Sequence, residues 1–252
     1  MPATAAFLLA CALVAHDGQA QPITVSAAVS LTEVMHELGR AYEAAAGGRV
    51  VYNFAASNVL ARQIVNGAPV DVFVSADEAQ MALVEKAQMV SPGTLVPVVG
   101  NQLALIVRID RHDLPAGVAA LSAPAVRRIA IGDPEAVPAG VYARQYLERA
   151  GIWSSVRARI VPVASVRAVL SAVANGAADA GIVYVTDVPR SDSVRVVAAI
   201  TGPEAPRIAY VACAISSSRR ADAARAFLTF LRTADASRIF ERRGFQPLAA
   251  AR

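Results

Sequence analysis

The sequence predicts an α/β protein of two lobes, joined by two crossings into a clamshell. Short apolar runs of strand length alternate with segments whose apolar residues fall at helical spacing, which is typical of βαβ units around a mostly parallel sheet. This rhythm breaks at prolines and glycines around residues 92–100 and again at 201–206. A chain of 252 residues has room for two such lobes of about 100 residues each.

The composition supports a packed core and excludes several classes of function. Hydrophobic residues make up 55% of the chain and charged residues 17%, which argues against disorder. The net charge of +4 comes from dispersed arginines, whereas a nucleic-acid surface would show a basic stripe with interleaved aromatic residues. After the N-terminus, the apolar runs are far shorter than the roughly 20 residues of a membrane span. We therefore expect neither a nucleic-acid partner nor a membrane-spanning helix in the mature chain.

Residues 1–21 resemble a secretory signal peptide. The apolar stretch at 5–15 is too short to span a membrane, and Gly18-Gln19-Ala20 offers a small-residue cleavage site. We therefore expect export, with the mature chain beginning near residue 22. The residues before Cys11 also faintly resemble a lipoprotein cleavage box, and we rank lipidation below simple secretion. Removal of the signal would leave Cys213 alone in an apolar run, where a buried residue is a better interpretation than a reactive thiol.

The first lobe is predicted to comprise residues 22–100 and 207–252. Apolar residues at helical spacing between Leu31 and Tyr42 indicate its first helix, which Gly47-Gly48 closes. The segment at 208–215 is interpreted as the strand that crosses back into this lobe. The other predicted elements are strands at 23–28, 50–55 and 70–75, and helices at 58–66, 77–87, 222–233 and 235–243.

The second lobe is predicted to comprise residues 101–206. Its first strand, at 103–108, is interpreted as the first crossing between the lobes. The remaining predicted elements are strands at 128–131, 159–163, 181–185 and 194–200, and helices at 138–150 and 166–175.

The stretch from Gly132 to Arg144 suggests an anion site at a helix start. A buried strand ends at Gly132, a loop follows, and a helix begins at Pro138. Proline suits the first helical position because the amide it lacks would have no acceptor within the helix. The free N–H groups from Ala139 onward and the positive end of the helix dipole then attract an anion without a basic side chain. An ordinary strand-to-helix turn is the simpler interpretation for one such turn alone.

The same arrangement recurs at three other predicted helix starts. They carry Ser30, Ser57 and Ser165, the last of these followed directly by Val166. Each serine alone is best explained as a helix N-cap. Ser30 and Glu33 match a capping box, with Ser at N-cap and Glu at N3. Ser57 has Leu60 in place of that glutamate, so its helix start is more open to an outside anion. Since parallel strands place these four starts at one edge of each sheet, a ligand would lie between them.

Other candidate chemistry is weak. His36 and His112 have no neighbours at metal-ligand spacing, so no metal site is predicted. No Ser-His-Asp or Cys-His set and no phosphate-binding loop pattern can be assembled, so an enzyme is not expected.

Several motifs in order resemble the periplasmic molybdate-binding proteins of ABC transporters, a type II solute-binding protein family. The resemblance covers nearly the whole mature chain. Its segments are Ala27-Ala28-Val29-Ser30-Leu31-Thr32, Ser57-Asn58-Val59-Leu60-Ala61-Arg62-Gln63-Ile64, Gly67-Ala68-Pro69-Val70-Asp71-Val72-Phe73-Val74-Ser75-Ala76-Asp77, Gly132-Asp133-Pro134 through Pro138-Ala139-Gly140, Gly181-Ile182-Val183-Tyr184 and Arg243-Gly244-Phe245.

The resemblance implies a periplasmic protein that captures molybdate or tungstate between its lobes and delivers it to the membrane permease of an ABC importer. It implies no cofactor and a monomer, and it assigns the oxyanion to the hydroxyls of Ser30, Ser57 and Tyr184 and to the backbone N–H groups of Ala139 and Val166. Helix-start geometry alone points to four of these positions. Tyr184 comes from the resemblance only, because a tyrosine at a strand end is usually a core or rim residue.

A site of hydrogen-bond donors suits this ligand. Molybdate, tungstate and sulfate are fully deprotonated dianions at neutral pH, whereas phosphate keeps a proton that requires an acceptor. Cavity size must separate molybdate from sulfate, so another oxyanion such as sulfate stays an alternative. An enzyme on the same two-lobed scaffold is a more distant one. Asp133 and Glu135 lie near the predicted site, and we expect their carboxylates to face solvent or to cap neighbouring turns.

Overall fold

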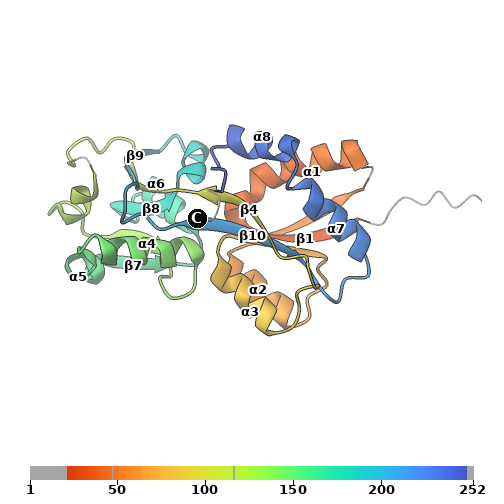
Figure 1. The fold of residues 1–252 in the computed structure, drawn as a ribbon. Helices are drawn as coiled ribbons and strands as arrows, with labels where there is room; N and C mark the ends of the chain where they lie inside the picture. Colours follow the sequence, from red (N-terminus) through yellow and green to blue (C-terminus); the bar gives the residue numbers. More distant parts are fainter. Residues whose placement is uncertain (1–21, 47, 116, 249–252) are drawn as a thin grey trace, which may run out of the picture.

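The computed structural model describes residues 22–46, 48–115 and 117–248. The predicted signal peptide and Gly47 of the predicted helix end lie outside the described residues. Two lobes lie side by side, each with a five-stranded sheet between helices (Figure 1). Within the described residues, none of the helices combines the length and apolar character needed to span a bilayer.

The first sheet has the strand order β2-β1-β3-β10-β4. Strand β1 pairs in parallel with β2 and β3, and β10 pairs antiparallel with β3 and β4. Its strands are β1 (Ile23–Ala28), β2 (Val50–Ala55), β3 (Val72–Ser75), β4 (Val96–Asn101) and β10 (Ile208–Ala214). The helices of this lobe are α1 (Thr32–Ala46), α2 (Ser57–Val65), α3 (Glu78–Lys86), α7 (Ala221–Phe230) and α8 (Ala234–Arg242).

The second sheet has the strand order β7-β6-β8-β5-β9. Strand β6 pairs in parallel with β7 and β8, and β5 pairs antiparallel with β8 and β9. Its strands are β5 (Leu103–Arg108), β6 (Ile129–Gly132), β7 (Ile160–Val163), β8 (Ala180–Tyr184) and β9 (Val194–Ala199). The helices of this lobe are α4 (Pro138–Arg149), α5 (Trp153–Val156) and α6 (Val166–Ala174), with 3₁₀ turns at Val118–Ser122, Arg157–Arg159 and Val185–Arg190.

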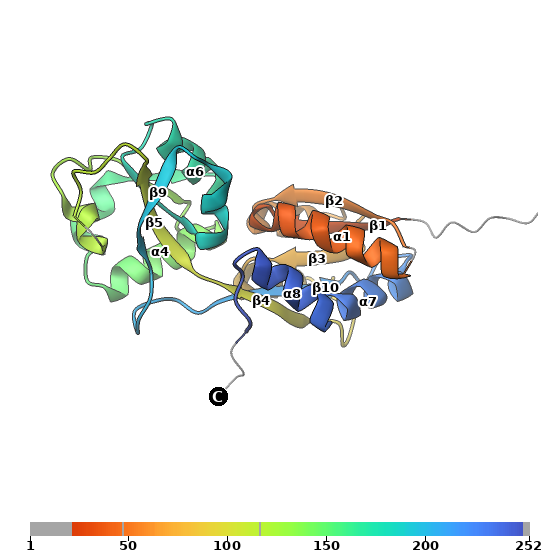
Figure 2. The same ribbon diagram turned by 90° about the horizontal axis from the view of Figure 1, so that it is seen from above.

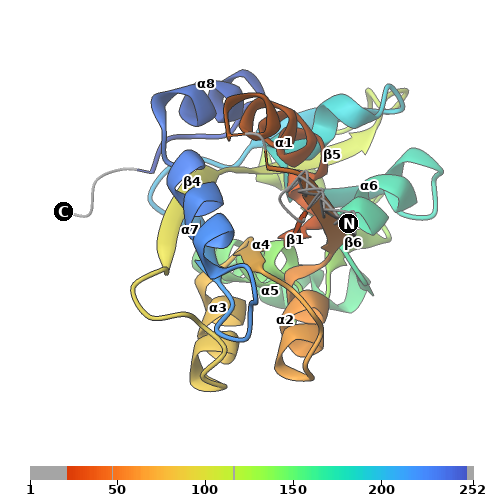
Figure 3. The same ribbon diagram turned by 90° about the vertical axis from the view of Figure 1, so that its right-hand side faces the viewer.

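The predicted fold class, two α/β lobes, is therefore confirmed, with sheets that contain both parallel and antiparallel pairs. Helices cover both faces of each sheet. In the first lobe α2 and α3 lie together on one side, and α1 and α8 lie on the other (Figure 3). In the second lobe α4 and α6 both pack on β6 and β8, from opposite sides (Figure 2).

Strand β4 lies inside the stretch that the sequence marks only as a break. Pro97 and Gly100 obscure it, since both residues are uncommon inside strands. Proline is tolerated here because β4 is the edge strand of its sheet. The N–H of Gly100 instead donates to the carbonyl of Gln246 at 2.7 Å, so the C-terminal segment covers the open edge. The chain thus passes between the sheets twice, between β4 and β5 and between β9 and β10.

The buried faces explain why the closing helices belong to the first lobe. Tyr42 of α1 meets Phe227 of α7 edge to face, with ring centroids 5.1 Å apart.

Cys213 of β10 is fully buried, and burial raises the pKa of its thiol to about 12. The interpretation of Cys213 as a core residue is therefore confirmed.

The turn from β6 into α4 is tight, and Gly140 is the residue that permits it. A Cβ on Gly140 would lie 2.0 Å from the carbonyl oxygen of Gly132, which no side chain can do without displacing one of the two segments. The start of α4 is therefore held against the end of β6 by the absence of a side chain.

We predict that Gly140→Ala destabilises the protein by about 1–3 kcal/mol, since overpacking forces the backbone to shift. Denaturant unfolding measures this loss. Arg149→Ala, an exposed change at the other end of α4, is the control and should stay within about 0.5 kcal/mol of the parent. Equal stabilities of the Gly140 variant and the parent would contradict the close packing described.

Candidate functional site

The two lobes repeat one arrangement at the edges that face each other. In each sheet the middle one of the three parallel strands is β1 or β6, and the helix that follows it, α1 or α4, lies on one face. The next of these strands along the chain, β2 or β7, leads into a helix on the other face, α2 or α6. The carboxyl ends of these strands meet where the strand order reverses, which is the usual ligand position in open α/β sheets. All five predicted site residues lie at such strand ends or helix starts.

These five residues line one small cavity between the lobes, with a volume of about 20 Å³. Ser30 and Ser57 come from the first lobe, and Ala139, Val166 and Tyr184 come from the second. The cavity is far smaller than the roughly 300–1,000 Å³ of sites for drug-sized molecules, so a large organic ligand would not fit without opening it. The other residues that line it are small or apolar: Ala28, Val29, Ala56, Ala76, Val137 and Pro138.

Ser30 is not the helix cap that the capping-box pattern predicts, so that prediction is wrong. It lies in the 3₁₀ turn Val29–Leu31, and α1 begins only at Thr32. Its hydroxyl lies 2.9 Å from the hydroxyl of Tyr210, a residue of β10. Glu33 is turned outward to arginines of the other lobe instead of closing a box. The local pattern fails because both side chains have partners far away in the sequence.

Ser57 also has a role other than capping, whereas Ser165 is a cap. The N-cap of α2 is Ala56, and the Ser57 oxygen accepts a hydrogen bond from the N–H of Ala76 at 3.0 Å. Since that N–H supplies the oxygen with a donor, the hydroxyl hydrogen of Ser57 remains available to the cavity it lines. Ser165 accepts from the N–H of Ala168 at 3.2 Å, which confirms the N-cap interpretation for this residue.

The backbone amides of Ala139 and Val166 both lie in the first turn of a helix. Pro138 is the first residue of α4, and Val166 is the first residue of α6 after its cap. Amides in the first turn of a helix have no acceptor within the helix, and both residues line the cavity. Two helix dipoles therefore present their positive ends to the same small volume.

Tyr184 supplies the observation that points most directly to a ligand. The residue is 1% exposed, and its hydroxyl is buried without a hydrogen-bond partner among the described residues. A buried hydroxyl left without a partner costs about 1–3 kcal/mol, so such groups are rare in folded proteins. Burial raises the pKa of this hydroxyl well above its ordinary value, which keeps its hydrogen in place. The Tyr184 hydroxyl is therefore a hydrogen-bond donor without an acceptor, on a residue that lines the cavity.

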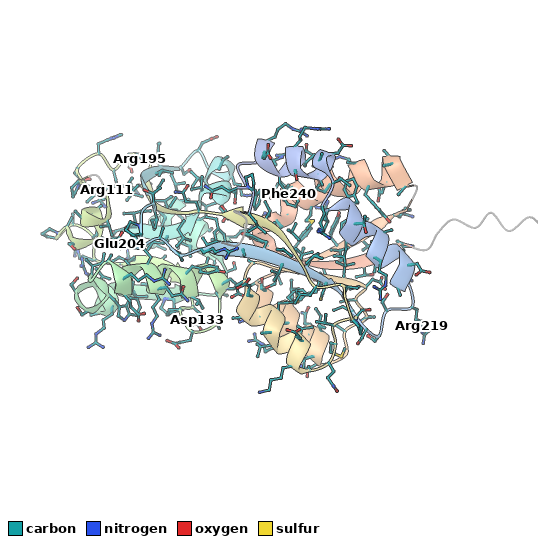
Figure 4. All side chains as sticks on the ribbon, in the orientation of Figure 1. Arg111, Asp133, Arg195, Glu204, Arg219 and Phe240 are labelled. Carbon is teal, nitrogen blue, oxygen red and sulfur yellow. The ribbon has the colours of Figure 1, made fainter. Side chains whose placement is uncertain are left out.

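No charged side chain lines this cavity in the part of the chain that the structure describes. The carboxylate of Asp133 accepts the N–H of Glu135 at 2.9 Å, and Glu135 pairs with Arg144 on the exposed side of α4. Figure 4 shows Asp133 at the periphery of the second lobe. The expectation that both carboxylates cap turns or face solvent is therefore confirmed.

Contacts between the lobes hold the cavity closed on two sides. Glu33, after the first strand of the first lobe, pairs with Arg167 of α6 at 2.7 Å and also with Arg190. The side-chain amide of Gln80, in α3, donates to the carbonyl of Ala136 at 3.3 Å. Sequence patterns alone could not find these contacts, because they join residues that lie 56 and 134 positions apart in the chain.

Asp187 is a fully buried carboxyl group beside this ion-pair cluster. Neither of its oxygens has a hydrogen-bond partner among the described residues, and the nearest charged contact is Arg190 Nε at 3.9 Å. Burial raises its pKa to about 7, although Arg167 opposes the shift. Both arginines pair with Glu33, so the buried carboxyl group of Asp187 is more stable in its protonated form.

We predict that Asp187 makes the protein less stable as the pH rises from about 4 to about 7. Its carboxyl binds a proton more tightly when folded than when unfolded, so between the two pKa values the folded state holds the extra proton and stability falls with rising pH. Asp187→Asn should remove this slope and exceed the parent in stability at pH 8, in urea unfolding across the pH range. A parent slope retained by the variant would assign the effect to another group.

A family model described as "Bacterial extracellular solute-binding protein" matches residues 23–246. The molybdate-binding protein ModA of Escherichia coli (strain K12) is 34% identical over 248 residues, which cover 96% of this chain and 95% of that protein. ModA of Haemophilus influenzae is 32% identical and covers 88% of this chain and 89% of its own length.

Among solved structures, the periplasmic molybdate-binding protein of Azotobacter vinelandii superposes with a TM-score of 0.81. It covers 90% of this chain and 100% of its own, and its 24% sequence identity makes this a likeness of fold alone. The match along the chain, its relatives and its two-lobed architecture agree with one another. The chain belongs to the family of bacterial extracellular solute-binding proteins.

Proposed function

We propose that this protein captures molybdate, and tungstate with it, in the cavity between its lobes and delivers the ion to the permease of an ABC importer. The observation that carries the proposal is the wall of that cavity, where hydrogen-bond donors from both lobes converge and the Tyr184 hydroxyl has no partner of its own. The relatives named for molybdate binding support the choice of ion.

Each of the five residues has a defined role in this proposal. The hydroxyls of Ser30 and Ser57 donate from the first lobe, and that of Tyr184 donates from the second. The N–H groups of Ala139 and Val166 donate from the starts of α4 and α6. An anion bound by both sets would join the lobes, which is how closure around a ligand is stabilised in clamshell proteins.

The electrostatics favour a dianion without a counter-cation. Oriented N–H and O–H dipoles supply a positive potential at the cavity wall, and they leave no buried charge behind when the ion leaves. A hydrogen phosphate ion would place its own hydrogen against another donor, and this mismatch disfavours it. The wall of the cavity, in the described part of the chain, offers no carboxylate, imidazole, thiol or amine, which supports binding and release rather than catalysis.

The cellular setting follows from the same proposal. We take residues 1–21 to be a signal peptide that directs the protein to the periplasm, where it acts as a monomer. The lobe limits that we propose, 22–100 with 207–252 and 101–206, lie at the two passages of the chain between the sheets.

Calorimetric titration of the mature protein with molybdate, tungstate, sulfate and phosphate tests the proposal. We expect molybdate and tungstate to bind far more tightly than sulfate, and phosphate to bind most weakly, because size separates the first two from sulfate and the extra hydrogen excludes phosphate. Tight binding of sulfate with molybdate no better would replace the proposed ligand with sulfate.

Ser57→Ala should weaken molybdate binding by about 1–3 kcal/mol, since it removes a buried donor to a charged ligand. The change also leaves the Ala76 N–H without its acceptor, so the folded fraction is checked by circular dichroism before titration. Ser171→Ala, an exposed serine on α6, is the matched control and should bind as the parent does. Parental affinity in the Ser57 variant would remove Ser57 from the site.

A further inference from the structure

We propose that Asn101 and Tyr210, outside the cavity on the two strands that join the lobes, are positioning residues that point the hydroxyl hydrogen of Ser30 into the cavity. Their effect is to hold this hydroxyl in its donor orientation toward the cavity, so that the site disfavours an oxyanion that carries a proton. The inference rests on the proposed function for the identity of the cavity as an oxyanion site.

The contact between Ser30 and Tyr210 leaves the direction of the hydrogen bond open when taken alone. The two hydroxyl oxygens lie 2.9 Å apart, and either could be the donor. Ser30 is 2% exposed and Tyr210 is fully buried, so the contact between them is shielded from bulk water. The direction matters because Ser30 lines the cavity and Tyr210 does not.

Asn101, the last residue of β4, decides the direction. Its side-chain oxygen accepts the N–H of Gln102 at 2.8 Å, which fixes which end of the amide is oxygen and which is nitrogen. The nitrogen then donates its two hydrogens, one to Thr186 Oγ1 at 2.9 Å and one to the Tyr210 hydroxyl oxygen at 3.2 Å. Tyr210 is therefore an acceptor toward Asn101.

The remaining steps follow from the number of hydrogens. The Tyr210 oxygen accepts from Asn101, and if Ser30 also donated to it, the buried Tyr210 hydrogen would have no acceptor among the described residues. That hydrogen is therefore directed to the Ser30 oxygen. Burial raises the pKa of Tyr210, so that hydrogen is retained. The Ser30 oxygen thus has a donor, and the Ser30 hydrogen is free to point into the cavity.

The hydroxyl of Ser57 is oriented in the same way, by a different donor. Its oxygen accepts from the Ala76 N–H, which leaves its hydrogen for the cavity. Both serines of the first lobe are consequently held as donors by groups behind them. In water a hydroxyl can reverse, but a serine held this way has one lone pair engaged and its hydrogen directed into the cavity, so it is a poor acceptor for the hydrogen of a hydrogen phosphate ion. A buried hydrogen left without an acceptor is a strong source of discrimination.

The relay also connects the cavity to both lobes. Asn101 belongs to the first sheet, and Thr186 lies in the 3₁₀ turn that follows Tyr184 in the second lobe. Thr186 is 7% exposed and Asn101 is 5% exposed, so this contact is buried at the junction. The side-chain amide of Asn101 therefore has one hydrogen-bond partner in each lobe: Tyr210 in the first and Thr186 in the second.

The test is Asn101→Asp, which replaces the two donor hydrogens with an acceptor. Tyr210 should then donate to the new carboxylate, Ser30 should donate to Tyr210, and a lone pair of Ser30 should face the cavity. The readout is the ratio of the dissociation constants of sulfate and phosphate at about pH 8, measured directly or by competition with molybdate. At that pH both ions are dianions of similar size, and only phosphate carries a hydrogen.

We expect the preference for sulfate over phosphate to shrink about tenfold or more in Asn101→Asp. The new negative charge weakens both dianions alike, so the ratio isolates the direction of the hydrogen bond. Tyr210→Phe, a milder change that frees the Ser30 hydroxyl to rotate, should shrink the ratio by a smaller factor and serves if the first variant does not fold. An unchanged ratio in a folded variant, with only a uniform loss of affinity, would overturn the relay.

The proposed function and the relay fail in different ways. If the parent protein showed no preference for molybdate, the proposed ligand would be replaced by another oxyanion. The ratio of the sulfate and phosphate dissociation constants could still be measured. Parental discrimination in the variants would reject the relay and leave the ligand intact.

Discussion

The proposed site depends on one constraint: hydrogen-bond donors from two separate lobes converge on a single small cavity, and no charged side chain of the described residues lines it. Most of these donors are fixed in place by the helix start or by a second group behind them. The amides of Ala139 and Val166 are fixed by helix starts, and the Ser57 hydroxyl is fixed by the Ala76 N–H. Tyr184 alone has no such partner, and it is held by burial.

The fold meets the constraint by using the same arrangement twice. A strand, a helix on one face, a second strand and a helix on the other face bring two helix starts to one sheet edge, and each lobe contains one such unit. Ser30 and Ala139 follow the first strands of the two units, and Ser57 and Val166 follow the second strands. The site therefore combines corresponding positions of two similar halves, and the tight contact of Gly140 with Gly132 brings α4 close enough to take part.

How much of this could be predicted from the sequence differs from residue to residue. The alternation of strands and helices, the proline at the start of α4 and the N-cap Ser165 are local signals, and they were sufficient for the fold class and for the two helix starts at Ala139 and Val166. Strand β4 was not predicted, because Pro97 and Gly100 usually interrupt a strand and their tolerance at a sheet edge cannot be known from the sequence. The positions of the five site residues on one cavity agree with the predicted set, although their contact with a ligand stays a prediction.

The errors arose where the partner lies far along the chain. The Ser30 and Glu33 spacing matches a capping box, yet Ser30 meets a tyrosine 180 positions away and Glu33 meets Arg167 in the other lobe. A capping pattern reports only what a helix start can offer, and tertiary contacts decide whether it is used. Tyr184 had no local signal at all, since an orphaned hydroxyl is visible only after the chain has folded around it.

The contact of Glu33 with Arg167 and Arg190 has a consequence for the outside of the molecule. The carboxylate belongs to one lobe and both guanidinium groups to the other, and all three side chains are between 20% and 38% exposed. Together the one carboxylate and the two guanidinium groups leave an excess of one positive charge. Separated, the first lobe would present an unpaired carboxylate, and the second lobe would present two guanidinium groups, of which Arg190 keeps Asp187 at 3.9 Å. The electrostatic face at this rim therefore differs between a shut and an opened molecule, and any protein that touches the rim meets a different charge pattern in each.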